Sequence, residues 1–330
     1  MQFPRSLRLP LAAVLSALLV ACATTGDTSQ TALPVMVVPA DNPVTPAKVA
    51  LGKQLFADPR LSGSGKTACQ SCHYRHLGWT DAQVLSRKDD GVLNTRHTPT
   101  LYNVGHQSVW YWDGRATTLE GQVTAAWRGQ SGADPVKVAA LLNTIPGYKT
   151  QFTAVYNTDA TPDNIAKTLA TFFRSLNSDN AAWDRYQRGD KGAVSAAAIE
   201  GHALFTGKGR CVLCHTAPVY GNSTFFNIGL EHGKEKPDVG RFNVTKNEAD
   251  RGAFKIPTLR SVELSAPYFH DGSVATLKEA VRYMASGGRP DPNKSPLLQA
   301  THLTEAELDK IVLFLNTLTS TEGWTQPQLP

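Results

Sequence analysis

The sequence predicts a mainly α-helical protein that consists of two similar units with long loops. Residues 276–284 and 304–318 each begin with a Thr-x-x-Glu capping box, and apolar residues then recur at positions i, i+3, i+4 and i+7. The same kind of periodicity predicts helices at 136–142 and 165–176. No alternating run is long enough for a substantial sheet, and the 26 glycines and 20 prolines indicate many loops.

The composition is that of a folded, weakly basic chain. Its 330 residues are enough for roughly two domains of about 150 residues each. Charged residues make up 18%, below the roughly 25% of typical soluble domains, which excludes a largely disordered or supercharged chain. The 33 basic and 28 acidic residues give a net charge of +5, too small to indicate a nucleic acid as partner.

The N-terminal segment has the features of a signal peptide, which we predict at 1–21. Two arginines precede an apolar stretch, 9–21, whose 13 residues are fewer than the roughly 20 that span a bilayer. Leu-Val-Ala directly before Cys22 resembles the lipobox of bacterial lipoproteins and predicts a lipid on Cys22, with an ordinary secretory signal as the alternative. Residues 22–43, rich in Thr, Ser, Ala and Pro, predict a flexible tether. The expected location is the periplasm, with the protein anchored to a membrane.

The four remaining cysteines fall into two identical Cys-x-x-Cys-His motifs. Their members are Cys69, Cys72 and His73 in the first motif and Cys211, Cys214 and His215 in the second. This is the attachment signature of c-type haem, in which the two thiols bind the vinyl groups and the histidine ligates the iron. A zinc site with four cysteines or two disulfides are the alternatives, but neither explains the histidine that ends both motifs. The sequence therefore predicts two covalently bound haem c groups.

The surroundings of the two motifs also repeat. Residues 52–56 (GKQLF) precede the first motif and 201–205 (GHALF) precede the second, and the first copy carries a longer connection to its cysteines. The fold class that we predict is thus mainly α, with two cytochrome c-type helical domains, each with one covalently bound haem, and long loops. A glycine-containing break at 189–192 places the domains at 44–189 and 190–330.

The residues available as sixth ligands differ between the two units. Met284 is the only methionine beyond the tether, and it lies on the apolar face of a predicted helix within the second unit. We therefore predict it as an axial ligand, which would raise the potential of the second haem. The first unit offers His76, His97 and His106 instead, and His76 follows His73 too closely to reach the opposite haem face. An open first iron would suit a peroxide-reducing enzyme, and two saturated irons would suit an electron carrier.

The chain resembles the bacterial di-haem cytochrome c peroxidases and their MauG-like relatives. The segments that carry the resemblance are 55–62 (LFADPRLS), 96–101 (RHTPTL), 112–115 (WDGR), 255–260 (KIPTLR) and 266–272 (APYFHDG). The resemblance implies an N-terminal peroxidatic haem and a C-terminal electron-transfer haem. It also implies that Trp112 relays electrons between them, that Gln122 lies in the peroxide pocket, and that Met284 is the axial ligand, with the adjacent Tyr283 a weak rival.

The resemblance also implies two further features, a bound calcium ion and a homodimer. Carbonyl groups of Ser265 and Pro267 would hold the calcium, but His97 replaces the usual asparagine ligand. Two further departures affect the first haem. Spacing places Asp89 where many of these peroxidases carry a displaceable histidine, which predicts an open iron. The catalytic glutamate of these peroxidases corresponds to a position within 128–132 (RGQSG), which contains no carboxylate. Gln130 could orient peroxide there, and Asp134 or a water would have to move its protons.

Three functions from different classes remain open at this point. The first is a peroxidase that reduces hydrogen peroxide with electrons from a small periplasmic cytochrome or cupredoxin. The second is a MauG-like oxidase acting on Trp or Tyr of a partner protein, which the missing glutamate favours and Met284 disfavours. The third is a non-enzymatic di-haem electron carrier, which requires a protein ligand on both irons. The peroxidase is the function that we expect.

Overall fold

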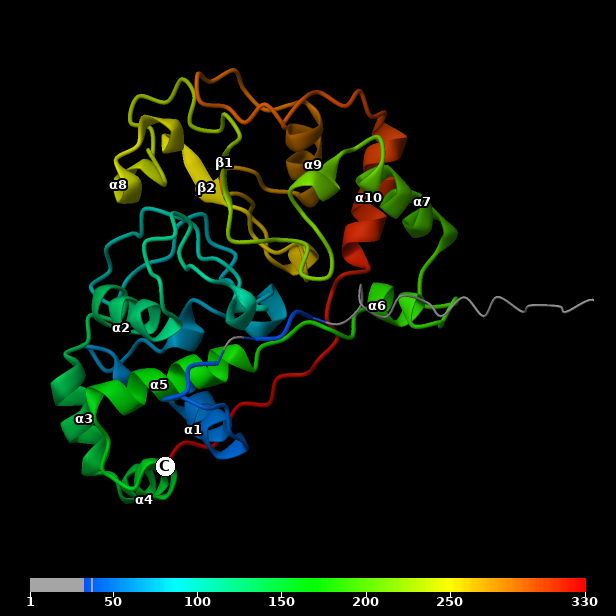
Figure 1. The fold of residues 1–330 in the computed structure, drawn as a ribbon. Helices are drawn as coiled ribbons and strands as arrows, with labels where there is room; N and C mark the ends of the chain where they lie inside the picture. The colour runs from blue at the N-terminus through cyan, green and yellow to red at the C-terminus, as the bar shows by residue number, and fades with distance from the viewer. Residues whose placement is uncertain (1–32, 37) are drawn as a thin grey trace, which may run out of the picture.

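The computed structural model describes residues 33–36 and 38–330, which form two helical cores (Figure 1). The described part contains ten α-helices, joined by long loops and short 3₁₀ turns, and one two-stranded antiparallel sheet. The mainly helical fold is therefore confirmed. The predicted signal peptide at 1–21 and Cys22, the predicted site of the lipid, lie outside the described residues. No helix of the described part is both long and apolar enough to cross a membrane.

The first core is built from five helices around α5. Four of the five start at a proline directly after a capping residue or turn, where the fixed φ of proline fits the first helical turn. The buried face of α5 packs on α1 and α2, which brings the two ends of this unit together. The helices are α1 (Pro46–Ala57), α2 (Leu119–Gly129), α3 (Pro135–Asn143), α4 (Pro146–Tyr156) and α5 (Pro162–Arg174).

The second core is built around the packed pair α7 and α10. Both predicted capping boxes are present: Thr276 accepts from Glu279 N, and Thr304 accepts from Glu307 N, each at 3.3 Å. The helices are α6 (Ala182–Gln187), α7 (Ala196–Thr206), α8 (Phe242–Thr245), α9 (Leu277–Ala285) and α10 (Glu305–Asn316). The strands are β1 (Phe225–Asn227) and β2 (Ala253–Lys255), paired with Phe226 opposite Phe254.

The glycines of the internal repeat lie where helices cross. A Cβ on Gly52 of α1 would be 2.6 Å from Thr168 O and 2.6 Å from the Cβ of Phe172, both on α5. A Cβ on Gly201 of α7 would overlap the backbone oxygen of Lys310 on α10. Glycine permits this close backbone approach in both units, which explains why the same Gly-x-x-Leu-Phe pattern occurs twice.

The chain passes from the first core to the second before α6. Trp183 on α6 packs with Phe314 of α10, at a ring-centroid distance of 4.9 Å, and belongs to the second hydrophobic cluster. The predicted boundary at 189/190 therefore lies later in the chain than the change of core. At the other end, Asn42 of the predicted tether is fully buried and bonds to Glu120 and to the Lys167 carbonyl.

The C-terminal segment 319–330 returns to the first core after α10 (Figure 1). Trp324 packs against Phe56 and Trp79, with ring centroids 6.0 and 5.2 Å apart, and Arg60 donates to the Pro330 carbonyl at 3.1 Å. The segment is a strap that connects the two units, and nothing local in its polar, proline-containing sequence indicates this packing.

Trp324→Ala is expected to destabilise the first core by about 1–2 kcal/mol, since a half-buried tryptophan loses less than the roughly 3–5 kcal/mol of a buried aromatic residue. Urea unfolding of the haem-loaded protein measures the change. Thr325→Ala, at an exposed neighbouring position, is the control and should leave the midpoint unchanged. Equal midpoints for both variants would show that the strap contributes no stability.

Candidate active site

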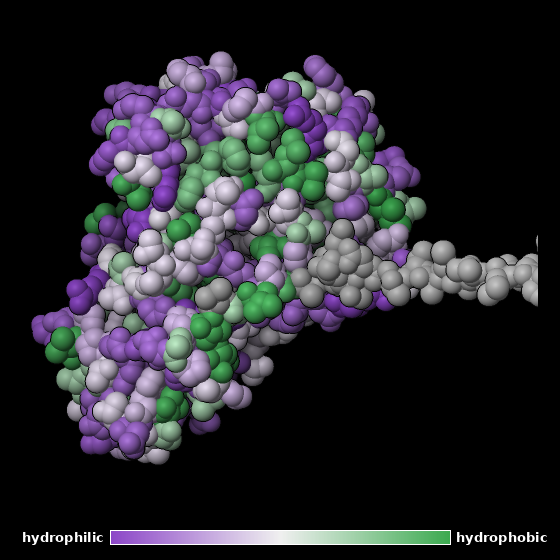
Figure 2. All heavy atoms as spheres, in the orientation of Figure 1, coloured by the Kyte–Doolittle hydropathy of each residue, from purple (hydrophilic) through white to green (hydrophobic). Residues whose placement is uncertain are grey.

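A hollow of about 470 Å³ lies between the two cores, and residues of both Cys-x-x-Cys-His motifs line it. This volume is in the range of roughly 300–1,000 Å³ that small-molecule and cofactor sites occupy. Figure 2 shows that apolar side chains gather in the middle of the face turned to the viewer, with hydrophilic ones over much of the upper rim. The lining of the hollow includes apolar residues of both cores, among them Leu169, Phe173, Ile311 and Leu315, together with the predicted attachment residues of both units.

The two motif histidines are held in the same way. His73 Nδ1 is 2.6 Å from Trp79 O, and His215 Nδ1 is 2.9 Å from Tyr220 O. A carbonyl oxygen only accepts, so Nδ1 carries the proton and Nε2 keeps its lone pair for a metal. Burial lowers the pKa of both imidazoles, which favours this neutral, ligating form. Both histidines line the hollow, as the haem prediction requires.

The four motif cysteines form no disulfide with one another and face the same hollow. The described residues contain no group of three or more His, Cys, Asp and Glu suited to a metal ion. The disulfide and zinc alternatives therefore find no support in the geometry, and the donor set fits covalent haem in both units.

Met284 lines the hollow together with Leu277, Ala280 and Val281 of α9, which is the apolar stripe that the sequence predicts. It is thus in the same cavity as His215. Tyr283 does not line the hollow, and its hydroxyl donates to Ile228 O at 2.9 Å. The geometry favours Met284 over Tyr283 as the residue that would complete the second haem.

In the haem-loaded protein, Met284→Ala is expected to lower the reduction potential of one haem and leave the other unchanged, because Met/His ligation raises the potential. An optical redox titration measures both potentials. Tyr283→Phe, which changes the neighbouring side chain of the same helix, should match the wild type. Unchanged potentials in Met284→Ala would exclude this residue as a ligand.

The part of the hollow that the first unit lines carries amide side chains, although acid–base chemistry there would need a carboxylate. Gln122, Val123 and Ala126 of α2 line the hollow, as does Gln130 directly after this helix. The Oε1 atom of Gln130 is buried and has no hydrogen-bond partner among the described residues. No aspartate or glutamate is among the residues that line the hollow within the described chain.

Neither predicted aspartate reaches this space. Asp134 Oδ1 accepts from Val136 N at 3.0 Å and caps α3, so its carboxylate is engaged at the surface. Asp89 accepts from Ser64 N at 2.8 Å and from Ser64 Oγ at 2.6 Å, which turns it toward the loop before the first motif. Neither residue lines the hollow, so proton transfer there would fall to water.

The three candidate histidines of the first unit have different surroundings. His76 is exposed, and His106 Nε2 is 3.2 Å from Asn177 Oδ1 outside the hollow. His97 lines the hollow, where its Nδ1 is 2.8 Å from Gln83 O and its buried Nε2 has no partner among the described residues. Only His97 remains as a rival sixth ligand. A nitrogen donor here does not fit calcium, which takes oxygen ligands.

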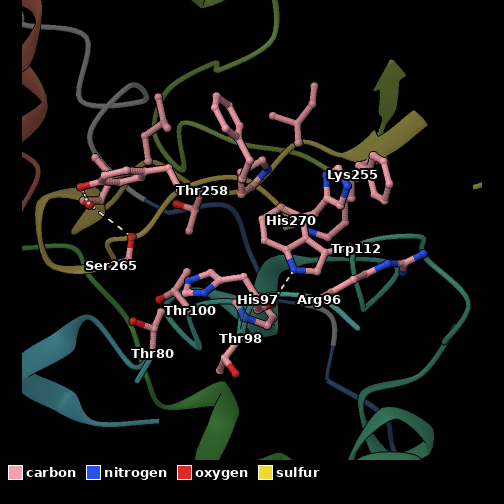
Figure 3. A pocket seen from close by; sticks show the side chains of 18 of the residues that line it. Thr80, Arg96, His97, Thr98, Thr100, Trp112, Lys255, Thr258, Ser265 and His270 are labelled. Carbon is pink, nitrogen blue, oxygen red and sulfur yellow. Dashed lines mark hydrogen bonds between the residues drawn. The ribbon is translucent and has the colours of Figure 1, made fainter. Parts of the chain in front are cut away.

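Trp112 connects the two units. Its Nε1 donates to His97 O at 2.8 Å, and its carbonyl accepts from Lys255 N of β2 at 2.7 Å. Figure 3 shows Trp112 between His97 on one side and His270 and Lys255 on the other. The neighbouring Arg96 forms ion pairs with Asp113 of the first unit, at 2.8 Å, and with Asp238 of the second unit, at 2.6 Å.

Two Cys-x-x-Cys-His motifs on one hollow between helical cores define a di-haem c-type cytochrome. The family model described as "Di-haem cytochrome c peroxidase" matches residues 46–192. The chain is 38% identical to "Cytochrome-c peroxidase IdrP1" of Denitromonas iodatirespirans, over 99% of this chain and 96% of the relative. It is 37% identical to "Methylamine utilization protein MauG" of Methylorubrum extorquens, over 88% and 84%.

The fold is also similar to the crystal structure of a MauG-like protein associated with microbial copper homeostasis. The TM-score is 0.81 at 29% identity, and the match covers 87% of this chain and 93% of that one. The chain therefore belongs to the di-haem cytochrome c peroxidase family and is an oxidoreductase of the peroxidase type. Membership of this family implies two haem c groups.

Proposed function

We propose that this protein reduces hydrogen peroxide to water with electrons from a small periplasmic cytochrome or cupredoxin. The observation that carries the proposal is the asymmetry of the hollow. Met284 accompanies His215 in the second unit, whereas α2 presents only amide and apolar side chains in the first. One closed and one open iron suit a peroxidase, because electrons are collected at one site and peroxide binds at the other.

The attachment residues have the same roles in both units. Cys69 and Cys72 would hold the first haem covalently with His73 as ligand, and Cys211 and Cys214 would hold the second with His215. Haem iron supplies the redox chemistry of peroxide reduction and of electron transfer. We assign the peroxidatic role to domain 44–189 and the electron-transfer role to domain 190–330.

The residues of this chain would bind peroxide and carry electrons. Gln122 and Gln130 can donate and accept hydrogen bonds, so they can orient peroxide, but an amide cannot act as a general acid or base near neutral pH. Each peroxide takes up two electrons and two protons to give two water molecules, and the protons would arrive through water in the hollow. Trp112 is the residue positioned to relay the electrons, since it bonds to both units.

A MauG-like oxidation of a partner protein is the second candidate. The lack of a carboxylate in the lining of the hollow, among the residues that the structure describes, favours it. Met284 supports the peroxidase instead. An electron carrier without enzymatic activity would need His97 as the sixth ligand of the first iron.

Steady-state oxidation of a reduced small cytochrome c by the haem-loaded protein, with and without hydrogen peroxide, separates these functions. Fast peroxide-dependent oxidation is the expected result. Slow oxidation together with a high-spin ferric signal that changes with peroxide would favour the MauG-like function. A spectrum of low-spin iron only, unchanged by peroxide in the oxidised and half-reduced states, would exclude both enzymatic functions. The electron carrier would then be the remaining function.

Cys22→Ala is expected to release the protein from membranes while the haem content stays the same, because several buried acyl chains contribute roughly 0.8 kcal/mol per CH₂ to anchoring. Fractionation of cells followed by haem staining measures both properties. Ser29→Ala, a change in the same segment, is the control and should stay with the membrane fraction. Membrane attachment of Cys22→Ala would contradict the lipid anchor.

A further inference from the structure

The hollow between the two units is lined by charges of one sign. Five cationic side chains face it, and no carboxylate does among the described residues. The five are Arg87, Arg96, Arg115, Arg210 and Lys255. A cavity with this charge pattern attracts anionic groups, because its apolar walls strengthen electrostatic interactions that water would otherwise screen.

The four arginines already have partners. Arg96 is paired with Asp113 and Asp238, and Arg115 with Asp113 at 2.9 Å. Arg87 is exposed and donates to the Gly91 carbonyl at 2.9 Å, and Arg210 is exposed and donates to Gln299 Oε1 at 2.7 Å. These charges are neutralised or solvated, so none of them requires a ligand in the hollow.

Lys255 differs from the arginines. Only 8% of this residue is exposed, and its ammonium group has neither a hydrogen-bond nor an ion-pair partner among the described residues. Burial alone lowers its pKa to about 8, with no neighbouring carboxylate to offset the effect. Taking an ammonium group out of water without a partner is unfavourable, and proteins normally pair such a group. An anion that is not part of the described chain would supply the partner that this ammonium group lacks.

We propose that Lys255 binds a carboxylate of a group held in the hollow, namely a haem propionate, at the junction of the two units. The inference rests on the haem groups of the proposed function, which bring carboxylates into a cavity whose own described lining has none. Lys255 is at the end of β2, and its backbone N–H donates to Trp112 O at 2.7 Å. Its side chain lies near Trp112 and His270 (Figure 3). The same charge would thus act on the haem and on the residue positioned to relay electrons.

A positive charge next to a haem carboxylate stabilises the reduced haem relative to the oxidised one, because reduction adds an electron. In the haem-loaded protein, Lys255→Met should therefore lower the reduction potential of at least one haem. We expect the ratio of reduced to oxidised haem at a fixed applied potential to fall about tenfold, and an optical redox titration measures it. Lys255→Arg keeps the charge and should restore the ratio to within a few-fold of the wild type.

Lys236→Met is the matched control, because it removes a lysine charge at an exposed position outside the hollow. It should leave both potentials unchanged. Wild-type potentials in a haem-loaded Lys255→Met variant would overturn the proposal. Lys255→Gln, which keeps a polar side chain, is the second variant for the case that Lys255→Met does not load with haem.

Phosphate distinguishes a propionate from a free anion as the partner of Lys255. At constant ionic strength, the potentials of the wild type should not depend on phosphate concentration. A phosphate-dependent shift that disappears in Lys255→Gln would assign the site to a free anion and overturn the propionate assignment. These measurements need haem but no turnover. A protein without peroxidase activity that still shows the expected shifts would reject the proposed function and retain this inference.

Discussion

Gln130→Glu is expected to raise kcat/KM for hydrogen peroxide by about 10²-fold, the lower end of what a positioned general acid–base group contributes. Gln130 lines the hollow, and its buried Oε1 atom has no partner among the described residues, so a carboxylate of almost the same shape fits without displacing a bond. This carboxylate could take a proton from one peroxide oxygen and return it to the other.

The measurement is the pH dependence of kcat/KM for the wild type and the variant with the same electron donor. The kcat/KM of the variant should fall at low pH as the new carboxylate becomes protonated. The wild type has an amide at this position, so this residue causes no such fall in its pH profile. Gln107→Glu is the control. Gln107 also lines the hollow, but it lies before α2 in the chain, whereas Gln130 comes directly after this helix. Equal gains in both variants would assign the effect to charge alone and contradict a role in proton transfer.

The parts of the structure that local sequence determines could be predicted. The capping boxes at Thr276 and Thr304 are interactions between residues three positions apart, and both helices begin where these boxes place them. The Cys-x-x-Cys-His motifs are equally local, since each places its thiols and histidine within five consecutive residues. The stripe that ends at Met284 is an apolar helix face in the sequence, and in the structure it lines the hollow.

The parts that depend on distant residues could not be predicted. Lys255 follows two apolar residues of β2 and looks like the polar end of a strand, so only the folded chain shows that this residue is buried and that its ammonium group has no partner among the described residues. Arg96 and Asp238 are separated by 142 positions, and no periodicity links them. The packing of Trp324 on the first core is another case, because Phe56 and Trp79 are more than 200 positions away.

A buried ion pair supports the second haem-binding loop. Arg260 is 1% exposed and donates to both carboxylate oxygens of Asp184, which is fully buried, at 2.7 and 2.9 Å. The Nε atom of Arg260 donates to Pro218 O at 2.6 Å. Pro218 lies two positions before Tyr220, whose carbonyl orients His215. The pair therefore connects α6 to the loop that holds the predicted ligand of the second iron.

Arg260→Leu is expected to destabilise the haem-loaded protein by about 3–5 kcal/mol, because it leaves the Asp184 carboxylate buried without its countercharge. Urea unfolding should show the loss, and the absorbance of the second haem should change at lower urea than that of the first. The double variant Asp184→Asn/Arg260→Leu should recover part of the stability, since no uncompensated charge remains. Arg251→Leu, which breaks an exposed ion pair with Glu248, is the control and should leave the midpoint almost unchanged. Equal unfolding midpoints for Arg260→Leu and this control would show that the Arg260–Asp184 pair does not stabilise the loop that holds His215.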